Sequence, residues 1–457
     1  MLEMRSYMHD GMKRMTSRRV TLAAAVFLMG ASAASAAPYL VVDAESGQAL
    51  IENQATQPWY PASLTKLMTT YVALQAVRDN RLTMDTPLTV SMRAARMPAS
   101  KMGFAPGTEV TLDNALKMLM VKSPNDIAVV VAEGIDGSVE GFADEMNAVA
   151  RKLGMRESHF VNPNGLHDPA HVSSARDMAI LARALLRDFP DHADLFDIGA
   201  IQLGDIIIPN HNGLLGHYPG ADGMKTGFTC PAGFNVVASA THNGRKLITV
   251  VLGSPSARTR TLEAAQLFER GFSQGSNGVS LDSLPLAANP QPPDMRGEIC
   301  SRRNHAAVMA AEEEMFSSPQ ATAPSAPTGR SGAPPGGPAP APPSSPVALL
   351  STERVHFDPV PVFVGAKDGW TGPVLAAKPT EAAPVTPPDA TAYSSDKPAT
   401  GDVSAAMPAP LALQGAVKSP VPAKPVKPPR GVRPPPKVAK AAIKPPVKPK
   451  PHKASGT

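Results

Sequence analysis

The distribution of proline divides this chain into a part that can fold and a part that lacks the composition to do so. The sequence has 457 residues and 50 prolines, about twice the ordinary share, and the prolines crowd beyond about residue 280. Residues 323–346 are rich in proline, alanine and serine, and residues 418–453 combine lysine and proline without any acidic residue. Such segments bury too little apolar surface to offset the entropy lost on folding. We therefore predict a disordered Pro/Ala/Lys-rich tail over residues 276–457.

The tail contains two features for which alternatives stay open. The apolar residues 356–363 and Trp370 form either a short docking motif or a stray apolar island. The lysines between residues 418 and 453 either hold the chain near anionic wall polymers or lipid headgroups, or belong to a solvated spacer. The net charge of +5 is mild, and we expect no nucleic-acid partner.

The first 36 residues are typical of an export signal. Basic residues between positions 13 and 19 precede the apolar run Val20 to Met29, and Ala34-Ser35-Ala36 fits the small-residue rule for cleavage. The alternative is an uncleaved membrane anchor, but the run is short and alanine-rich for a membrane span. We therefore predict a signal peptide over residues 1–36 and an exported protein, located in the periplasm or on the wall side of the cytoplasmic membrane.

Residues 37–275 alternate between strand and helix patterns and predict one α+β domain, a central antiparallel sheet flanked by helices. Residues 39–52 indicate a hairpin, and Asn243-Gly244 is the strongest short signal for a second one between two apolar runs. Apolar residues at helical spacing indicate the helices. The expected helices run from Pro61 to about Val77, Leu112 to Val121, Ile127 to about Ile135, Phe142 to Leu153, Met178 to Leu186 and Arg258 to Phe272.

The stretch Pro61 to Lys66 places a hydroxyl and an amine one turn apart at the start of a helix. Ser63 and Lys66 are three residues apart and so lie on one helix face. A serine becomes a strong nucleophile only with a base beside it, which Lys66 would supply. The S-x-x-K pattern is too short to carry this hypothesis by itself.

A second stretch, Ser123-Pro124-Asn125-Asp126, has an ordinary structural interpretation. Serine before a helix, proline at its first position and an acid three residues after the serine are typical of a capping box. Taken alone, the stretch favours simple capping. Ser174 and Asp177 have the same spacing and predict a second capped helix.

The histidines and cysteines have modest interpretations. His167 and His171 are four residues apart, but Asp168-Pro169 between them indicates a loop instead of a helical metal site. The favoured interpretation of Cys230 is a half-buried free cysteine. A regulatory thiol, or a bridge to Cys300 in an oxidising compartment, is the alternative.

Three motifs in order make the chain resemble a known family. Serine acyl transfer needs a nucleophile, a proton shuttle, oxyanion donors and groups that hold the substrate. With S-x-x-K, S-x-N and K-T-G, the chain resembles the penicillin-recognising serine D,D-peptidases, which share the β-lactamase/DD-peptidase-like fold. Over about residues 38–273 it is similar to the low-molecular-mass D-alanyl-D-alanine carboxypeptidases. The matching segments are Tyr60–Thr69, Asn164–Leu166, Ser174–Met178, Asn212–Leu215 and Asp222–Gly227.

The resemblance implies roles for the residues of the first two motifs. Ser63 is expected to be the acylated nucleophile. Lys66 is expected to act as a neutral base, with a pKa lowered by burial and by the second cation, Lys225. Ser123 would pass the proton to the leaving amine, and Asn125 would hold the substrate amide and orient Lys66.

The third motif is expected to bind substrate. Lys225 and Thr226 would hold the terminal carboxylate, and Gly227 would permit close approach to the strand. The backbone N–H of Phe228, with that of Ser63, would form the oxyanion hole. His211 stands where many relatives carry an arginine, which puts part of the carboxylate contact in doubt or makes it pH-dependent.

The implied function is a D-Ala-D-Ala carboxypeptidase that trims peptidoglycan stem pentapeptides, needs no metal or cofactor and is inhibited by β-lactams. A D,D-endopeptidase of the same family is the nearest alternative. A class A β-lactamase is disfavoured because the sequence lacks the motif that carries the deacylating glutamate of that class. A catalytically silent wall-binding protein is disfavoured by the intact motifs. The chain departs from well-known relatives in the Pro124 of its second motif. It also has the tail in place of their β-rich domain and amphipathic anchor.

Overall fold

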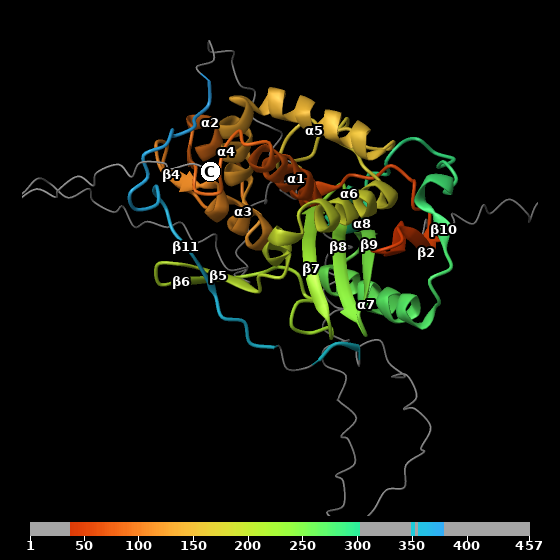
Figure 1. Cartoon of the computed structure of the whole chain (residues 1–457). Coiled ribbons are helices and arrows are strands. Elements are labelled where there is room, and N and C mark those ends of the chain that lie inside the picture. Colours follow the sequence, from red (N-terminus) through yellow and green to blue (C-terminus); the bar gives the residue numbers. More distant parts are fainter. Residues whose placement is uncertain (1–36, 302–348, 352–354, 379–457) are drawn as a thin grey trace, which may run out of the picture. The chain divides into compact units, whose positions relative to one another are not determined.

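A central antiparallel sheet organises the computed structural model, which describes residues 37–301, 349–351 and 355–378 (Figure 1). The six strands lie in the order β10-β2-β1-β9-β8-β7, which leaves β7 at one edge. Their bounds are β1 Tyr39–Asp43, β2 Gln48–Asn53, β7 Ala221–Thr229, β8 Gly233–His242, β9 Arg245–Ser254 and β10 Val279–Ser280. The α+β prediction is confirmed. The expected signal peptide and the lysines of residues 418–453 lie outside the described residues.

The second hairpin forms at Asn243-Gly244, as its sequence predicts. Both residues have positive φ, 51° and 79°, and the turn connects β8 to β9 with register from His242–Arg245 onward. Asparagine and glycine tolerate this left-handed backbone better than other residues, which explains their strength as a hairpin signal. The hairpin of β1 and β2 is also present.

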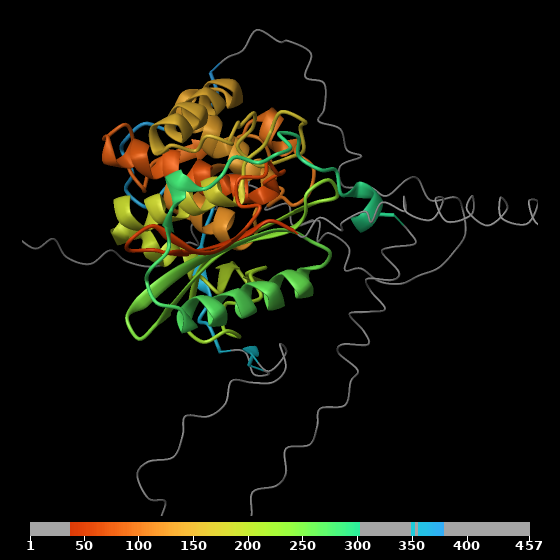
Figure 2. The same cartoon turned by 90° about the vertical axis from the view of Figure 1, so that its right-hand side faces the viewer.

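Helices cover both faces of the sheet (Figure 2). Strand β1 shows why, because Leu40 and Val42 face one buried cluster and Val41 faces the other. Helix α7 packs against β8, β9 and β1 on the Val41 face, and α6 packs against β1 and β9 on the other. The helices are α1 Thr65–Arg78, α2 Met92–Ala95, α3 Leu112–Val121, α4 Asn125–Asp136, α5 Val139–Leu153, α6 Ala175–Asp188 and α7 Ala257–Ser273. The 3-10 segments are the single turn η1 Ala62–Leu64 and the longer η2 Pro190–Phe196, which is kinked at His192.

The two predicted caps have different outcomes. Ser174 is the N-cap of α6, and its Oγ accepts the Asp177 N–H at 3.1 Å, which confirms that cap. The capping interpretation of Ser123 is wrong. Pro124 occupies the N-cap position of α4, while Ser123 has φ of 60° and its Oγ has no hydrogen-bond partner among the described residues. Its position is set by the site described below.

The folded domain does not end near Gly275, so the predicted boundary of the tail is wrong. Strand β10 pairs with β2, and η3 (Leu281–Ser283) and α8 (Arg296–Ile299) follow it. The buried guanidinium of Arg176 donates to the Leu281 carbonyl and to Asp282, which holds η3 on the domain. The proline-rich composition of the segment gives no indication of these specific contacts.

The favoured interpretation of Cys230 as a free thiol is also wrong. Cys230 and Cys300 form a disulfide across 70 positions of sequence. The bond connects the turn between β7 and β8 to α8, and so fixes the segment after α7 to the end of the β7–β8 hairpin.

Residues 355–378, which we call the strap, also pack on the domain. Strand β11 (Val360–Val362) adds in parallel to β5 (Ala200–Leu203), which pairs with β6 (Ile206–Pro209). Figure 1 shows the strap in blue, passing β5 and continuing toward α2 and β4 (Glu109–Thr111). Val362 is buried in the main apolar cluster, so the apolar stretch docks within this chain through this residue, while Phe363 is 45% exposed.

Further backbone hydrogen bonds fix the strap along its length. Gly365 N–H donates to Glu109, Leu375 N–H donates to Pro87 at the start of β3 (Pro87–Thr89), and Lys378 N–H donates to Gly137. A side chain at Gly199 would overlap the ring of Phe357, so this glycine permits the close approach of the strap. Within the three described ranges, none of the helices has the length and apolarity needed to cross a membrane.

Candidate active site

The turn η1, which carries Ser63, lies against the edge strand β7. A Cβ added to Gly227 would stand 2.9 Å from the Pro61 carbonyl oxygen and 3.1 Å from the Ser63 nitrogen. Only glycine therefore allows η1 and β7 to pack at this distance. Gly165, with φ of 81°, supports the turn from the other side, where a Cβ would overlap the carbonyl of Ala62. The first and third motifs thus meet through backbone atoms.

Lys66 connects Ser63 to the second motif. Its side chain is fully buried, and its Nζ lies 3.0 Å from Ser63 Oγ, 3.0 Å from Asn125 Oδ1 and 2.6 Å from the carbonyl oxygen of Asn164. Burial lowers the pKa of Lys66 well below its ordinary value, and the positive charge of Lys225 lowers it further. A neutral Nζ can donate to the Asn125 and Asn164 oxygens and still accept the proton of Ser63.

The backbone around Ser123 aims its hydroxyl at the site. Ser100 Oγ donates to the carbonyl of Lys122, and the Asn125 N–H donates to the carbonyl of Ser100. The Asn125 amide also donates to Pro98, which fixes its oxygen toward Lys66. Ser123 remains buried at a strained positive φ, with its Oγ unpartnered within the described chain. Strain and an unpaired buried hydroxyl together indicate a position kept for chemistry.

A cleft of about 320 Å³ brings the three motifs together. It is lined by residues of all three and by the aromatic pair Phe228 and Phe234, whose rings stack at 4.2 Å. Its lining residues are Ser63, Ser100, Lys122, Ser123, Asn125, His211, Thr226, Gly227, Phe228, Phe234, Ala257 and Arg260. Most of the residues predicted from the sequence therefore line one cleft, and Lys66 and Lys225 are buried behind it.

Buried cations give this cleft a positive end. Lys225 is 2% exposed and donates to the carbonyl of Thr226, and its pKa is lowered to about 7 by burial and by Arg260. Arg260 is 5% exposed, its Nε has no partner among the described residues, and burial lowers its pKa to about 10. Two buried cations that lack a carboxylate partner in this part of the chain favour an anionic ligand.

Arg260 is a site residue that the sequence reasoning missed. It belongs to α7, and it precedes Ala264 and Leu267 at helical spacing. Those two residues face the core, so Arg260 occupies a position where an apolar residue is expected. A charged residue on the apolar face of a helix is the sequence signal that could have identified Arg260 as a site residue.

His211 stands at the mouth of the cleft and lies near three cations. Desolvation in the cleft, followed by the charges of Lys225, Lys122 and Arg260, lowers the pKa of His211 to about 4. The imidazole is therefore neutral at pH 7 and adds no charge to the pocket. Arg260 Nη2 lies 3.5 Å from the His211 carbonyl oxygen. An arginine is therefore present in this region, but α7 supplies it, whereas position 211 holds histidine.

The two histidines of the 160–171 loop have structural positions. His171 is buried, accepts the Val161 N–H at Nδ1 and contacts Thr65 Oγ1 through Nε2 at 2.7 Å. His167 packs edge-on against the ring of Tyr60. These contacts steady the first turn of α1 from the loop side.

The family model described as D-alanyl-D-alanine carboxypeptidase matches residues 25–256. The chain is 37% identical over 254 residues to the D-alanyl-D-alanine carboxypeptidase DacA of Haemophilus influenzae, covering 54% of this chain and 65% of the relative. It is 37% identical over 249 residues to DacC of Escherichia coli, covering 53% and 62%. The chain thus spans less than two thirds of the length of these curated relatives.

Solved structures agree with the sequence relatives. The D-alanyl-D-alanine carboxypeptidase DacD of Francisella tularensis superposes with a TM-score of 0.51 at 30% identity, over 52% of this chain and 70% of that one. Penicillin binding protein 5 of H. influenzae gives a TM-score of 0.50 at 37% identity, over 52% and 71%. With a family model that matches half of its length, the chain belongs to the D-alanyl-D-alanine carboxypeptidase family.

Proposed function

We propose that this protein is a serine D-Ala-D-Ala carboxypeptidase that removes the terminal D-alanine from peptidoglycan stem pentapeptides. The observation that carries the proposal is the position of Lys66 Nζ, 3.0 Å from Ser63 Oγ and 3.0 Å from Asn125 Oδ1, beside the edge strand β7, which carries the buried Lys225. The relatives named above share the activity in their names.

Acylation begins with proton transfer from Ser63 to neutral Lys66. Ser63 Oγ attacks the carbonyl carbon of the penultimate D-alanine, and the oxyanion receives hydrogen bonds from the backbone N–H groups of Ser63 and Phe228. The C–N bond then breaks, and the terminal D-alanine leaves with a proton that Ser123 relays from Lys66 to its amine. Water hydrolyses the acyl-enzyme with Lys66 again as base, which restores Ser63.

The substrate binds as an added strand along β7. Within the described residues no strand pairs with the outer edge of β7, so an extended peptide can pair with its backbone. The terminal carboxylate then meets Lys225, Thr226 and Arg260, which selects substrates with a free C-terminus at that position. β-Lactams are inhibitors in this scheme because their carbonyl and carboxylate reach the same groups, in keeping with the name penicillin binding protein 5 that one solved relative carries.

The proposed site of action is outside the cytoplasm, in the periplasm or beside the wall. Disulfides persist in oxidising compartments, and the Cys230–Cys300 bond favours such a location. The export signal predicted for residues 1–36 agrees with this proposal.

Two measurements test the function together. Full-length protein should be labelled by a fluorescent penicillin and should release free D-alanine from a pentapeptide, and Ser63→Ala should lose both signals while keeping its circular dichroism spectrum. Folded wild-type protein that takes no label and releases no D-alanine would overturn the proposal. If the protein instead cuts the cross-links of muropeptides and releases no free D-alanine from the pentapeptide, the endopeptidase activity is assigned in its place.

A further inference from the structure

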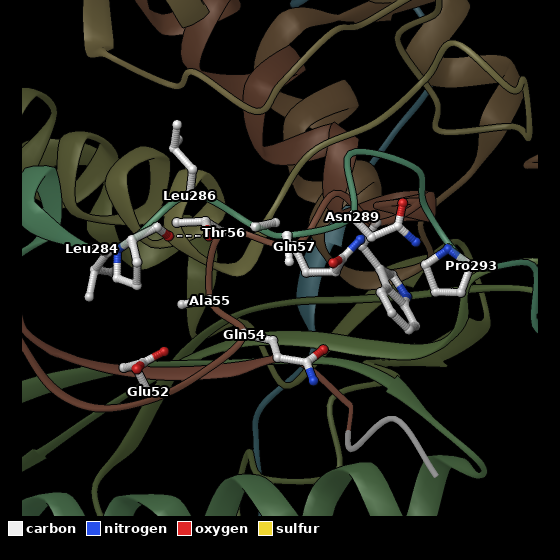
Figure 3. A pocket seen from close by; sticks show the side chains of 13 residues that line it. Glu52, Gln54, Ala55, Thr56, Gln57, Leu284, Leu286, Asn289 and Pro293 are labelled. Carbon is white, nitrogen blue, oxygen red and sulfur yellow. Dashed lines mark hydrogen bonds between the residues drawn. The ribbon is translucent and has the colours of Figure 1, made fainter. Parts of the chain in front are cut away.

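A second cavity, of about 540 Å³, lies between residues 52–59 and the segment 284–293 that follows η3 (Figure 3). It shares no lining residue with the cleft at Ser63. Figure 3 shows Glu52 and Gln54 on one side of the cavity and Leu286 and Asn289 on the other. Its volume lies within the range of about 300–1,000 Å³ that is usual for small-molecule sites.

The lining of this cavity suits an uncharged polar ligand that also has apolar faces. The lining carries the amides of Gln54, Gln57 and Asn289 and the carboxylate of Glu52. Gln57 Nε2 also donates to the Gln291 carbonyl, and Asn289 Oδ1 also accepts the Gln291 N–H, so a ligand would share these groups with the chain. Neither lysine nor arginine lines the cavity, so an anionic ligand is disfavoured. The other lining residues are Ala55, Thr56, Trp59, Leu284, Pro285, Leu286, Ala287, Ala288 and Pro293. A pyranose ring with an N-acetyl group combines these properties.

The direction of the substrate on β7 leads toward this cavity. With its carboxylate at Lys225 and Thr226 and its scissile carbonyl at Phe228, the stem peptide continues past Thr229 to the hairpin tip. Three further residues of a pentapeptide, at about 3.3 Å each, extend about 10 Å beyond the scissile bond. The end that leaves the cleft there is the amino end, through which a stem peptide is attached to its glycan.

Three bonds join the hairpin tip to Trp59, which lines the cavity, and to the segment that follows Pro293. Trp59 Nε1 donates to the Ala232 carbonyl at 2.8 Å, and the Met295 N–H donates to the Pro231 carbonyl at 3.1 Å. The Cys230–Cys300 disulfide is the third bond. Trp59 lines the cavity, and Met295 comes two residues after Pro293, which also lines it. The Trp59 side of the cavity is therefore held against the end of β7 from which the glycan side of the substrate emerges.

We propose that this cavity is a glycan subsite, which binds one N-acetylated hexosamine ring of the strand that carries the stem peptide. The inference rests on the proposed function and deepens it, because it makes glycan-attached stems the preferred substrate over free peptides. The amides bind the hydroxyls and the N-acetyl group, while the leucine and proline side chains cover the apolar face of the ring. Binding at the cavity adds affinity without changing the chemistry at Ser63.

The test compares D-alanine release from a free pentapeptide and from the same pentapeptide on an N-acetylglucosaminyl-N-acetylmuramyl disaccharide. Wild-type full-length protein should show a kcat/KM about tenfold higher for the disaccharide substrate, through a lower KM. Ala287→Trp, which fills the cavity, should raise KM for that substrate alone and bring the two kcat/KM values together. Pro290→Trp is the matched control, because Pro290 is exposed in the same segment and does not line the cavity.

Fluorescent penicillin acylation checks that each variant is folded. If Ala287→Trp fails to acylate, Asn289→Ala replaces it and should lower the preference at least threefold. Equal kcat/KM for both substrates in the wild type would overturn the inference. A preference for the disaccharide substrate that survives in both Ala287→Trp and Asn289→Ala would overturn it as well. Neither result touches the proposed function, which fails only if D-alanine is released from neither substrate.

Discussion

Lys225 and Arg260 are two buried cations, Arg260 in the lining of the cleft and Lys225 behind it, and the charge of Arg260 lowers the pKa of Lys225. Neither takes part in an ion pair within the described residues. A substrate carboxylate would form ion pairs with both cations. The free energy that their desolvation costs in the free enzyme would then be offset on binding.

Replacing Arg260 by alanine should weaken substrate binding and change the titration of Lys225. KM for a pentapeptide should rise about tenfold, the loss expected for one charged hydrogen bond of about 1.5 kcal/mol. The pKa of Lys225 should move up from about 7, because a neighbouring positive charge is gone. Steady-state kinetics check the first effect, and Arg260→Lys, which keeps the charge, should retain most of the affinity. An unchanged KM in Arg260→Ala would contradict this role.

The pH dependence of kcat/KM should be bell-shaped. Activity is lost at low pH because Lys66 must be neutral to act as base, and its lowered pKa places that limb far below the ordinary lysine range. Activity is lost as pH rises above about 7, because Lys225 in the free enzyme then loses the proton that attracts the carboxylate. A bound carboxylate raises the pKa of Lys225, so the alkaline limb of kcat should lie at higher pH. In Lys225→Arg, any remaining activity should lack that alkaline limb.

Ser123→Gly should make the protein more stable and the enzyme much slower. The positive φ of Ser123 costs a residue with a side chain about 1 kcal/mol, which glycine avoids, and the unpartnered Oγ contributes no hydrogen bond to lose. Turnover should fall roughly 100-fold or more, because proton transfer to the leaving amine is lost. Urea unfolding and D-alanine release measure the two effects. Reduced stability in this variant would show that Ser123 has a structural partner.

His211→Arg should tighten substrate binding at pH 7. The imidazole is neutral there because its pKa is lowered to about 4, so arginine adds a charge that histidine lacks. KM for the pentapeptide should fall about threefold, an effect that added salt should reduce. The alkaline limb should move to lower pH, since a further cation lowers the pKa of Lys225. His211→Gln keeps the site neutral and should match the wild type at pH 7.

Val362→Asp should destabilise the domain although it lies more than 80 residues after α7. Val362 is 4% exposed in β11 and belongs to the main apolar cluster, so a carboxylate there should cost about 3 kcal/mol of unfolding free energy. Val364→Asp, two residues along at a side chain 45% exposed, is the matched control and should change stability little. Equal stability of the two variants would mean that the strap contributes nothing to the fold.

Patterns of local origin could be predicted from the sequence. The bounds of α3 follow from its apolar spacing, and the Asn243-Gly244 turn follows from its φ requirements. The three motifs could be assigned to one site because each carries a recognisable chemical role.

Features that depend on distant partners could not be predicted in the same way. The local rules for capping assign Ser123 a role that the site overrides by placing it at positive φ. Cys230 finds Cys300 only because η3 and α8 return the chain to the hairpin tip, which no spacing reveals. Arg260 lines the cleft because of how α7 packs on the domain. Strand β11 follows a long proline-rich stretch, and composition alone does not distinguish it from the residues around it.

The parallel pairing of β11 with β5 has a consequence for the order in which the protein is made. Val360 pairs with Ile201, so nearly the whole folded domain leaves the ribosome before the strand that covers β5 exists. Until then one edge of β5 is open to any extended segment it meets. A shortened version that stops after α8, chosen to remove only proline-rich sequence, would keep that edge open permanently. A shortened version that keeps every contact seen in the described residues extends at least to Lys378, whose N–H donates to Gly137.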